Sequence, residues 1–231
     1  MKYICATSSN RARYVSQFIG SLQLNQRDGW NLMVSQEPMG EQDSVKEMIR
    51  NFGGTSWVNE SPLGCDANIY KLCSFAFGNP DCEALVYFDD DMLLSPDAIE
   101  LCDWYLARQH APEEAGICLC NEASDPSQPD SISAKDTWRG LVCQGYCYTR
   151  RQWDDFVNPN FWVRHPWFGG QGYDWAIGHM AQHLNRIILR PRFSRTQHIG
   201  MVGIHGAAAG VHTKPFPEHF CQTTGHAYRI E

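Results

Sequence analysis

Three consecutive carboxylates, Asp89, Asp90 and Asp91, follow the apolar run at residues 84–88. A continuous apolar run of this length is typical of a strand that is buried on both faces. Adjacent like charges repel, so three acids at the end of a buried strand are unfavourable unless a cation neutralises them. In open α/β sheets, ligands bind just beyond the carboxyl ends of the strands. The acids are therefore placed to hold a divalent cation and, through it, an anionic ligand such as a diphosphate.

A plainer interpretation of this stretch is an acidic, capped loop after a strand. Ser95 and Pro96 have the residue types of an N-cap and a first helical turn, so they predict a helix directly after the acids. We favour metal or ligand binding over the plain loop, because the acids follow a core strand without a break.

Small polar residues also follow the first apolar run of the chain. Thr7, Ser8, Ser9 and Asn10 precede Arg11 and a helical pattern that begins near residue 12. These side chains can cap that helix. They could equally line a nucleotide pocket, with Arg11 reaching a base or a phosphate. Both interpretations remain open from the residues alone.

A second informative stretch spans residues 167–175, where three glycines and several aromatic residues precede Asp174. The glycines allow the backbone to approach a ligand closely. Asp174 falls in the expected first turn of a helix that reaches about residue 185, where it could serve only as a cap. His198 follows a predicted strand at residues 187–189 and could be an ordinary loop histidine. With the acids elsewhere in the chain, it could also complete the coordination shell of a cation.

Strands and helices alternate along the first 109 residues. Strands are expected at residues 3–6, 30–34, 56–58, 84–88 and 116–120, with helices at about 12–22, 44–52, 65–77 and after 95. Ser44 and Glu47 have the spacing of a capping box. Residues 121–136 predict a mobile loop, and 140–148 a further strand. The alternation predicts one α/β domain over residues 1–231, with a mixed, mostly parallel sheet flanked by helices.

The composition fits such a domain. The chain has 231 residues, 43% hydrophobic and 19% charged, which is typical of a globular protein. The net charge of −7 argues against a broad nucleic-acid surface. No apolar run approaches the roughly 18 residues of a membrane span, and the first residues do not form a signal peptide. We therefore expect a cytoplasmic protein whose ten cysteines stay reduced.

The order of these parts resembles a GT-A glycosyltransferase. The similar features are the polar turn after the first strand, the apolar strand ending in Asp-x-Asp, the glycine-rich loop before Asp174, and Gln-His-Ile-Gly at residues 197–200. The resemblance covers residues 3 to about 200. It implies a Rossmann-like fold and an enzyme that moves a hexosyl or pentosyl group from a nucleotide-sugar to a hydroxyl, with Mn²⁺ or Mg²⁺ as cofactor. A UDP- or GDP-sugar is the expected donor.

The resemblance also implies roles for single residues. Asp89 would contact the ribose or the sugar, and Asp91 would ligate the metal together with His198. Asn68 matches a polar position that faces the donor, and Asp174 matches the base of inverting members. By the same resemblance, Thr7, Ser8, Arg11 and Asp90 would lie on the donor side. His212 resembles a metal-and-diphosphate motif of some retaining relatives, and we favour His198 because it follows a strand directly.

Residues 1–120 are expected to form the nucleotide-sugar half, 121–200 the acceptor half and 201–231 a C-terminal tail. The sequence does not identify the acceptor, which could be a small molecule, a glycan, a protein or a modified nucleic-acid base. Two other classes remain open. A nucleotidyltransferase uses a similar sheet and an acid-bound metal, and a non-catalytic sugar- or nucleotide-binding module would need no base.

Overall fold

The computed structural model describes residues 1–9, 11–121, 124, 126–127, 131–133, 144–163, 172–200, 215 and 217–230. Eight strands form one sheet in the order β3-β2-β1-β4-β8-β6-β9-β7. They are β1 (Lys2–Ser8), β2 (Trp30–Gln36), β3 (Thr55–Val58), β4 (Ala84–Asp89), β6 (Glu114–Cys118), β7 (Ile132–Ser133), β8 (Tyr146–Thr149) and β9 (Ile187–Pro191). A separate pair consists of β5 (Met92–Leu94) and β10 (Thr196–His198).

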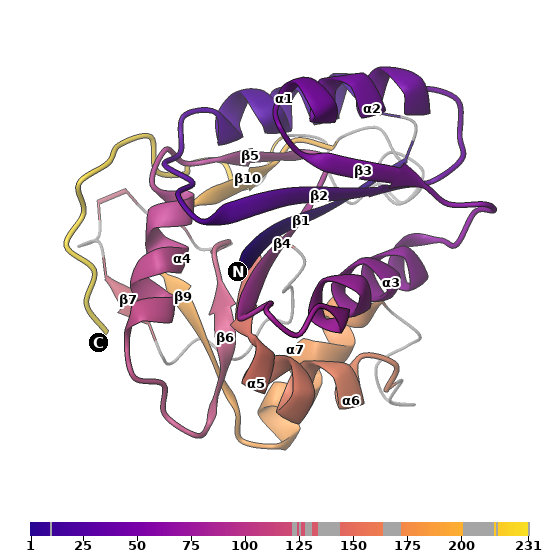
Figure 1. Cartoon of the computed structure of the whole chain (residues 1–231). Helices are drawn as coiled ribbons and strands as arrows, with labels where there is room; N and C mark the ends of the chain where they lie inside the picture. Colours follow the sequence, from indigo (N-terminus) through magenta and orange to yellow (C-terminus); the bar gives the residue numbers. More distant parts are fainter. Residues whose placement is uncertain are drawn as a thin grey trace.

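Helices cover both faces of the sheet, with α1 and α2 on one side and α3 on the other (Figure 1). The helices are α1 (Ala12–Leu22), α2 (Gln42–Asn51), α3 (Cys65–Gly78), α4 (Ala98–Ala107), α5 (Arg150–Gln152), α6 (Asn158–Asn160) and α7 (Tyr173–His183). A π-helical turn at Trp153–Val157 joins α5 to α6. The predicted α/β class with a mixed, mostly parallel sheet is confirmed.

Strand β1 lies between β2 and β4 and is parallel to both. The chain runs outward from β1 to β2 and β3, and α3 then returns it to β4 on the opposite side of β1. The strand order therefore reverses at β1, and such a reversal opens a crevice beyond the carboxyl ends of the two strands that flank it. Thr7 pairs in register with Asp89 at this end of the sheet.

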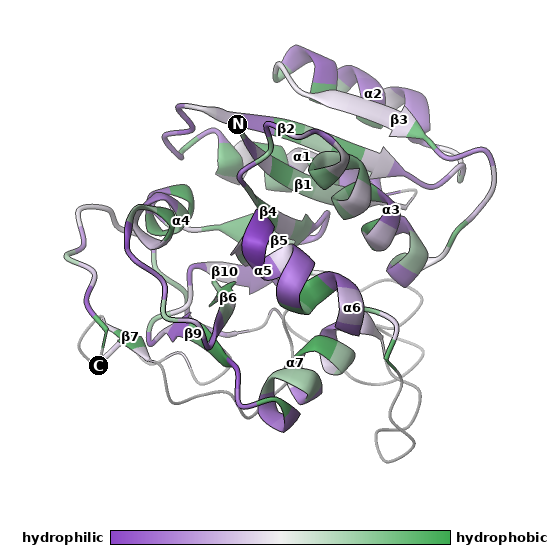
Figure 2. Cartoon of the chain, turned by 60° about the horizontal axis from the view of Figure 1, so that its bottom comes forward, coloured by the Kyte–Doolittle hydropathy of each residue, from purple (hydrophilic) through white to green (hydrophobic). Residues whose placement is uncertain are grey.

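Two apolar cores lie on opposite faces of the sheet, because successive strand residues point to opposite sides. Val86 belongs to the core under α1, α2 and α4, and its neighbour Tyr87 belongs to the core under α3 and α7. Both faces of β4 are covered, which explains its uninterrupted apolar run. The helices carry both hydrophobic and hydrophilic residues, as the mixed colours of Figure 2 show.

Two predicted helix starts are wrong. Helix α2 begins at Gln42 with Glu41 as its N-cap residue, so Ser44 lies inside the helix and forms no capping box. Helix α4 begins at Ala98 rather than at Ser95. The reason for the second error is β5, a strand that the sequence analysis did not predict, which occupies Met92–Leu94 and pairs with β10.

Other differences lie between residues 121 and 150. The strand β7 falls within the expected loop 121–136, and parts of that loop lie outside the described residues. The strand expected at 140–148 is β8, and residues 140–143 also lie outside the described part. Thr149 and Gln152 form a capping box at α5 that the sequence analysis did not identify. The described cysteines are all free. Within the described residues, none of the helices is long and apolar enough to cross a membrane.

A fully buried ion pair joins α4 to the segment before β10. Arg195 Nε donates to Asp97 Oδ2 at 2.8 Å, and neither side chain is exposed to solvent. Tyr228, near the end of the chain, donates its hydroxyl to the same Oδ2 at 2.8 Å. One carboxylate therefore fixes three parts of the chain, namely α4, the approach to β10 and the C-terminal segment.

We expect Asp97→Asn to destabilise the protein by about 3–5 kcal/mol, because it removes the carboxylate charge that pairs with the buried Arg195 guanidinium. Urea denaturation followed by circular dichroism would measure the loss. Glu100→Gln is the matched control, since Glu100 is exposed on the same helix, and it should change the free energy of unfolding by less than about 0.5 kcal/mol. Equal stability of the Asp97 and Glu100 variants would contradict this role of the ion pair.

Candidate functional site

Asp89 ends β4 beside the end of β1, at the reversal of strand order. Tyr87 donates its hydroxyl to Asp89 Oδ1 at 2.6 Å, and Thr7 Oγ1 lies 2.7 Å from the same hydroxyl. Burial, and then the negative charge of Asp91, raise the pKa of Asp89 to about 7. This carboxyl is thus held in place by its hydrogen bonds, and a nearby positive charge would stabilise its ionised form.

Asp90 joins the acids to the turn after β1. The side chain is 1% exposed, and its Oδ2 accepts a hydrogen bond from the Ser9 backbone N–H at 3.3 Å. Arg11 Nη2 forms an ion pair with Asp90 Oδ1. Burial raises the pKa of Asp90 to about 6, against the opposing charge of Arg11 and a hydrogen bond from Ser8. Asp90 therefore shapes the loop around the site.

Among the described residues of this turn, none caps α1 with its side chain. Arg11 is the N-cap residue of α1 and makes no side-chain capping bond. The first helical N–H, that of Ala12, instead donates to Glu41 Oε2 at 2.8 Å. Thr7 and Ser8 contact the groups around the acids. Asn10 lies outside the described residues.

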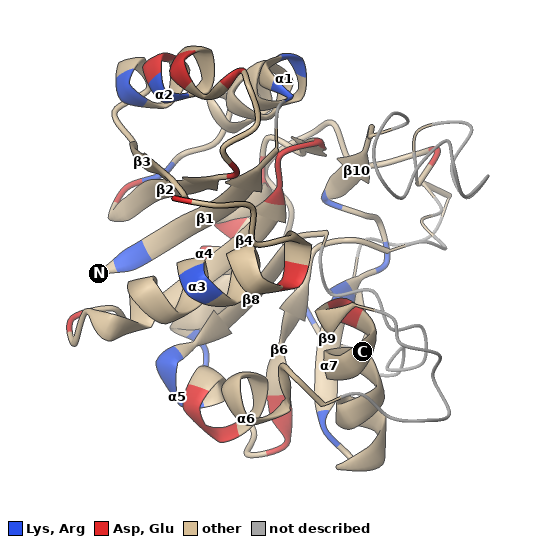
Figure 3. Cartoon of the chain, turned by 90° about the vertical axis from the view of Figure 1, so that its right-hand side faces the viewer, with Lys and Arg blue, Asp and Glu red and all other residues tan. Residues whose placement is uncertain are grey.

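The pairing of β5 with β10 brings His198 to Asp91. His198 is in register with Met92, and the Ile199 N–H donates to the Asp91 carbonyl at 2.8 Å. His198 Nε2 lies 3.4 Å from Asp91 Oδ2. Figure 3 shows the acidic run beyond β4 on the side where β10 lies. Two residues that are 107 positions apart in the chain thus become neighbours.

Asp91 and His198 shift each other's pKa. Burial acts to raise the pKa of Asp91, but the hydrogen bond and charge of His198, together with Arg11, hold it below the ordinary value. Burial acts to lower the pKa of His198, but the bond to Asp91 and the charges of Asp91 and Asp89 raise it. Each partner therefore stabilises the charged form of the other.

Gly200 is required for this arrangement. A Cβ atom at residue 200 would lie 1.9 Å from Asp91 Oδ2, closer than any real contact. Asp91 therefore packs directly against the backbone that follows β10. The carboxylate and the strand can approach this closely only because residue 200 has no side chain.

The residues around Asp91 fit a divalent cation. Asp91 Oδ1 is buried and has no hydrogen-bond partner among the described residues, so one carboxylate oxygen is available for a ligand. Carboxylate oxygen and imidazole nitrogen are suitable ligands for Mn²⁺, and carboxylate oxygen also suits Mg²⁺. Among the described residues, the guanidinium of Arg11 and the imidazole of His198 oppose the three acids, so a cation could still be attracted by their negative charge. Asp91 and His198 are the residues that would hold it.

Asp174 lies in the first turn of α7, after its N-cap residue Gly172. Asp66, from the first turn of α3, accepts a hydrogen bond from the Tyr173 N–H at 3.1 Å and so fixes the start of α7. A Cβ at Gly172 would lie 2.9 Å from Asp174 Oδ1 and 3.1 Å from Asp66 Oδ1, so both carboxylates face this glycine. Asp174 is therefore not the N-cap residue of its helix.

Two further observations relate Asp174 to the acids after β4. The rings of Tyr87 and Tyr173 meet edge to face with centroids 6.0 Å apart, and Tyr87 also bonds Asp89. Cys65 is exposed, yet the pKa of its thiol is raised, first by desolvation and then by the negative charges of Asp89, Asp66 and Asp174. The start of α7 and the end of β4 thus contribute to one region of negative potential.

Asn68 is placed in the interior. It is 2% exposed, and its Oδ1 accepts hydrogen bonds from Ser35 Oγ at 2.5 Å and Asn59 Nδ2 at 2.9 Å. These bonds tie α3 to β2. The glycine-rich loop at 167–171 and the alternative ligand His212 lie outside the described residues.

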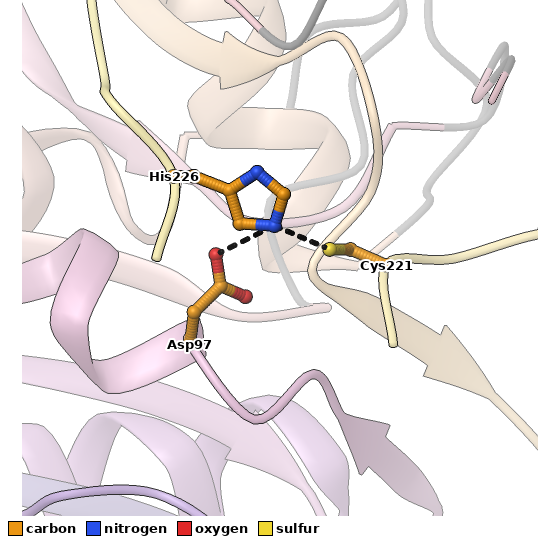
Figure 4. A group of neighbouring side chains, drawn as sticks. All are labelled: Asp97, Cys221 and His226. Atoms are coloured by element: carbon orange, nitrogen blue, oxygen red, sulfur yellow. Dashed lines mark hydrogen bonds and ion pairs between the residues drawn. The ribbon is translucent and has the colours of Figure 1, made fainter. Parts of the chain in front are cut away.

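A second group of metal-binding residue types consists of Asp97, Cys221 and His226 (Figure 4). His226 Nε2 lies 3.3 Å from Cys221 Sγ and 3.9 Å from Asp97 Oδ2. That oxygen already accepts hydrogen bonds from Arg195 and Tyr228, and the buried guanidinium repels a cation. The chemistry of this group fits an anchor for the C-terminal segment better than a cation site.

The sequence analysis missed Tyr87, Asp66 and Gly200. Tyr87 was taken only as a core residue, although it alone among the apolar residues of the run has a hydroxyl. Asp66 falls at the start of the helix expected at 65–77, and its position there gives no sign of its contact with the Tyr173 N–H. Gly200 enters the sequence analysis only as the last residue of Gln-His-Ile-Gly, and its contact with Asp91 depends on an acid more than a hundred positions earlier in the chain.

We expect Gly200→Ala to move the Asp91 carboxylate away from His198, because the added methyl group occupies its position. The pKa of His198 should then fall towards its ordinary value, since the bond to Asp91 raises it. NMR titration of the imidazole would measure the change. Gly20→Ala is the control, because a Cβ there has nothing within 4 Å. An unchanged His198 titration in a folded Gly200→Ala protein would contradict the proposed packing.

Comparison with known proteins identifies the fold. TarS 1–349 from S. aureus, in complex with UDP-GlcNAc, superposes with a TM-score of 0.55 at 12% identity, over 82% of this chain and 56% of that one. TarS 1–349 in complex with UDP superposes with a TM-score of 0.54 at 12% identity, over 82% of this chain and 57% of that one. The chain thus spans little more than half the length of these structures.

No protein-family model and no curated protein sequence matches this chain. The chain has a GT-A-like glycosyltransferase fold.

Proposed function

We propose that the protein is a metal-dependent glycosyltransferase that moves a hexosyl or pentosyl group from a nucleotide-sugar to a hydroxyl acceptor. The observation that carries this proposal is the meeting of Asp89, Asp91 and His198 at the reversal of strand order, on a GT-A-like fold. Parallel α/β sheets bind their ligands at this position. An acid cluster with a buried, unpartnered oxygen suits a cation-bound anionic ligand there.

The donor in this proposal is a UDP- or GDP-sugar. Thr7 and Ser8 lie at the end of β1 and Arg11 follows them, so they would contact the donor from that side. Asp89 lies beside Thr7 at the end of β4 and would accept a hydrogen bond from the ribose or the sugar. UDP-GlcNAc and UDP are ligands of TarS, which has the same fold. Asn68 would act indirectly, by fixing α3 against β2 next to the crevice.

The cofactor in this proposal is Mn²⁺ or Mg²⁺, held by Asp91 and His198. When bound, such a cation neutralises charge on the leaving diphosphate, a contribution of several kcal/mol at the transition state. Asp90 and Arg11 keep the loop after β1 beside Asp91. Tyr87 orients Asp89 through the bond to its Oδ1.

Asp174 is the proposed base, which would make the transfer inverting. A base removes the proton of the acceptor hydroxyl as the oxygen attacks the sugar carbon, and it typically accelerates the reaction by about 10²- to 10⁴-fold. The first turn of α7 stabilises the ionised carboxylate through the helix dipole. Asp66 holds the start of that helix and would thereby position Asp174.

One domain would span residues 1–231, with the nucleotide-sugar half at 1–120, the acceptor half at 121–200 and the tail at 201–231. The cytoplasm is the proposed location. The segments that would face the acceptor, residues 121–140 and 157–171, lie largely outside the described residues.

A nucleotidyltransferase or a non-catalytic binding module would share several of these features. Incubation with UDP- and GDP-sugars, with and without Mn²⁺, separates the three classes. Release of the nucleoside diphosphate with transfer or hydrolysis of the sugar supports the glycosyltransferase. Pyrophosphate release would favour a nucleotidyltransferase, and binding without turnover would favour the module.

We expect donor binding to depend on Asp91 and His198. Asp91→Asn keeps the shape of the side chain but removes its charge, and it should weaken Mn²⁺-dependent UDP binding by about tenfold or more. His198→Ala should act in the same direction, because it removes the second ligand. Isothermal titration with UDP in Mn²⁺ would measure both affinities.

His183→Ala is the control for this experiment, because His183 is exposed at the end of α7. Its UDP affinity should match that of the wild type. Full UDP affinity of a folded Asp91→Asn protein in Mn²⁺ would rule out the proposed donor site.

We expect Asp174→Asn to lower turnover by about 10²-fold or more while the melting temperature and UDP affinity stay normal. The amide cannot accept the proton of the acceptor hydroxyl. Asp154→Asn, at an exposed acid of the π-helical turn, should leave turnover unchanged. NMR analysis of the product should find the inverted anomer. An active Asp174→Asn enzyme that makes the retained anomer would show that Asp174 is not the base.

A further inference from the structure

Arg11 already contacts two carboxylates of the acid cluster, so a cation that binds there meets a positive charge that is in place. Its Nη1 donates to Asp91 Oδ2 at 2.6 Å, and its Nη2 pairs with Asp90 Oδ1. One guanidinium therefore bridges two neighbouring carboxylates from the loop after β1. The carboxylate oxygen that it contacts on Asp91 is the same one that faces His198.

A divalent cation and Arg11 compete for Asp91. Both are positive, and both use Asp91 as a partner, so each weakens the binding of the other through direct repulsion. Asp91 Oδ1, which has no partner among the described residues, provides a place for a cation to bind first. A cation that binds there partly neutralises the charge of Asp91. The attraction between Asp91 and Arg11 then becomes weaker.

Arg11 is also incompletely satisfied where it lies. Its Nε has no hydrogen-bond acceptor among the described residues, although the atom is buried. The side chain is 26% exposed, so one end reaches solvent and can move outward. The guanidinium carbon already lies 5.4 Å from the centroid of the Tyr14 ring, a contact that does not depend on Asp91. Release from Asp91 would therefore break one hydrogen bond and retain the ion pair with Asp90 and the contact with the Tyr14 ring.

We propose that Arg11 is an exchangeable counter-ion, which neutralises Asp90 and Asp91 in the empty protein and leaves Asp91 when the metal binds. The inference rests on the proposed metal-dependent donor site. Released from Asp91, the guanidinium stays tied to Asp90 at the mouth of the crevice, where the diphosphate of a donor offers it new oxygens. Cation and nucleotide then bind cooperatively, because the nucleotide accepts the arginine that the cation displaces.

Binding of Mn²⁺ alone, measured by isothermal titration without nucleotide, tests the exchange. Arg11→Gln should bind Mn²⁺ tighter than the wild type by about tenfold or more, because a competing positive charge is removed. Arg11→Lys keeps the charge but cannot bridge two carboxylates, so its affinity should lie between the two. Arg13→Gln is the matched control on the same loop-helix junction, since Arg13 is exposed, and it should stay within about twofold of the wild type.

The same proteins are then titrated with UDP in saturating Mn²⁺. Arg11→Gln should bind UDP more weakly than the wild type, although it binds Mn²⁺ more tightly. Opposite changes in the two affinities are what the exchange specifically predicts. The melting temperature of each variant confirms that it is folded. Arg11→Lys provides a folded protein if removal of the charge leaves Asp90 and Asp91 too repulsive for a stable fold.

Several outcomes would overturn the inference. If Arg11→Gln or Arg11→Lys binds Mn²⁺ no tighter than the wild type, while sugar transfer still requires Mn²⁺, the exchange is wrong and the proposed function stands. If none of the folded proteins binds Mn²⁺, both the exchange and the proposed metal dependence are wrong. If Arg11→Gln binds both Mn²⁺ and UDP more tightly, Arg11 opposes the metal but does not recognise the nucleotide.

Discussion

Repulsion among three carboxylates at the end of one buried strand is the constraint on which the site depends. Asp89, Asp90 and Asp91 are consecutive in the chain, and β4, which ends at Asp89, is packed on both faces, so the three acids stay close together. Each acid is stabilised by different groups. Asp89 is hydrogen-bonded by Tyr87, Asp90 is held by the turn after β1, and Asp91 is paired with His198 and Arg11.

The groups that stabilise the acids come from distant parts of the chain, which explains why the peripheral elements matter for the site. The β5–β10 pair exists outside the main sheet and places His198 at Asp91. The buried Asp97–Arg195 pair lies just before β10 and anchors the segment that leads into it. The C-terminal segment adds Tyr228 to the same carboxylate. Stability of the fold and geometry of the acid cluster are therefore linked through one short stretch of chain.

The region around Asp174 follows the same principle on the other side of the crevice. Asp66 fixes the start of α7 by a hydrogen bond to its backbone, and Tyr173 packs against Tyr87. Desolvation raises the pKa of Cys65, and the negative charges of the acids of β4, α3 and α7 raise it further. A cation at Asp91 would relieve this repulsion for all of them at once.

The sequence by itself determined the α/β class, the main strands and helices, and the acids at the end of β4. These features depend on local patterns: apolar runs, helical spacing and like charges in succession. Tertiary structure alone decided β5 and β10, the start of α4, the contact of His198 with Asp91, and the need for glycine at residue 200. Each of these depends on groups far apart in the chain, and local residue patterns carry no information about which distant carboxylate or strand a residue will meet.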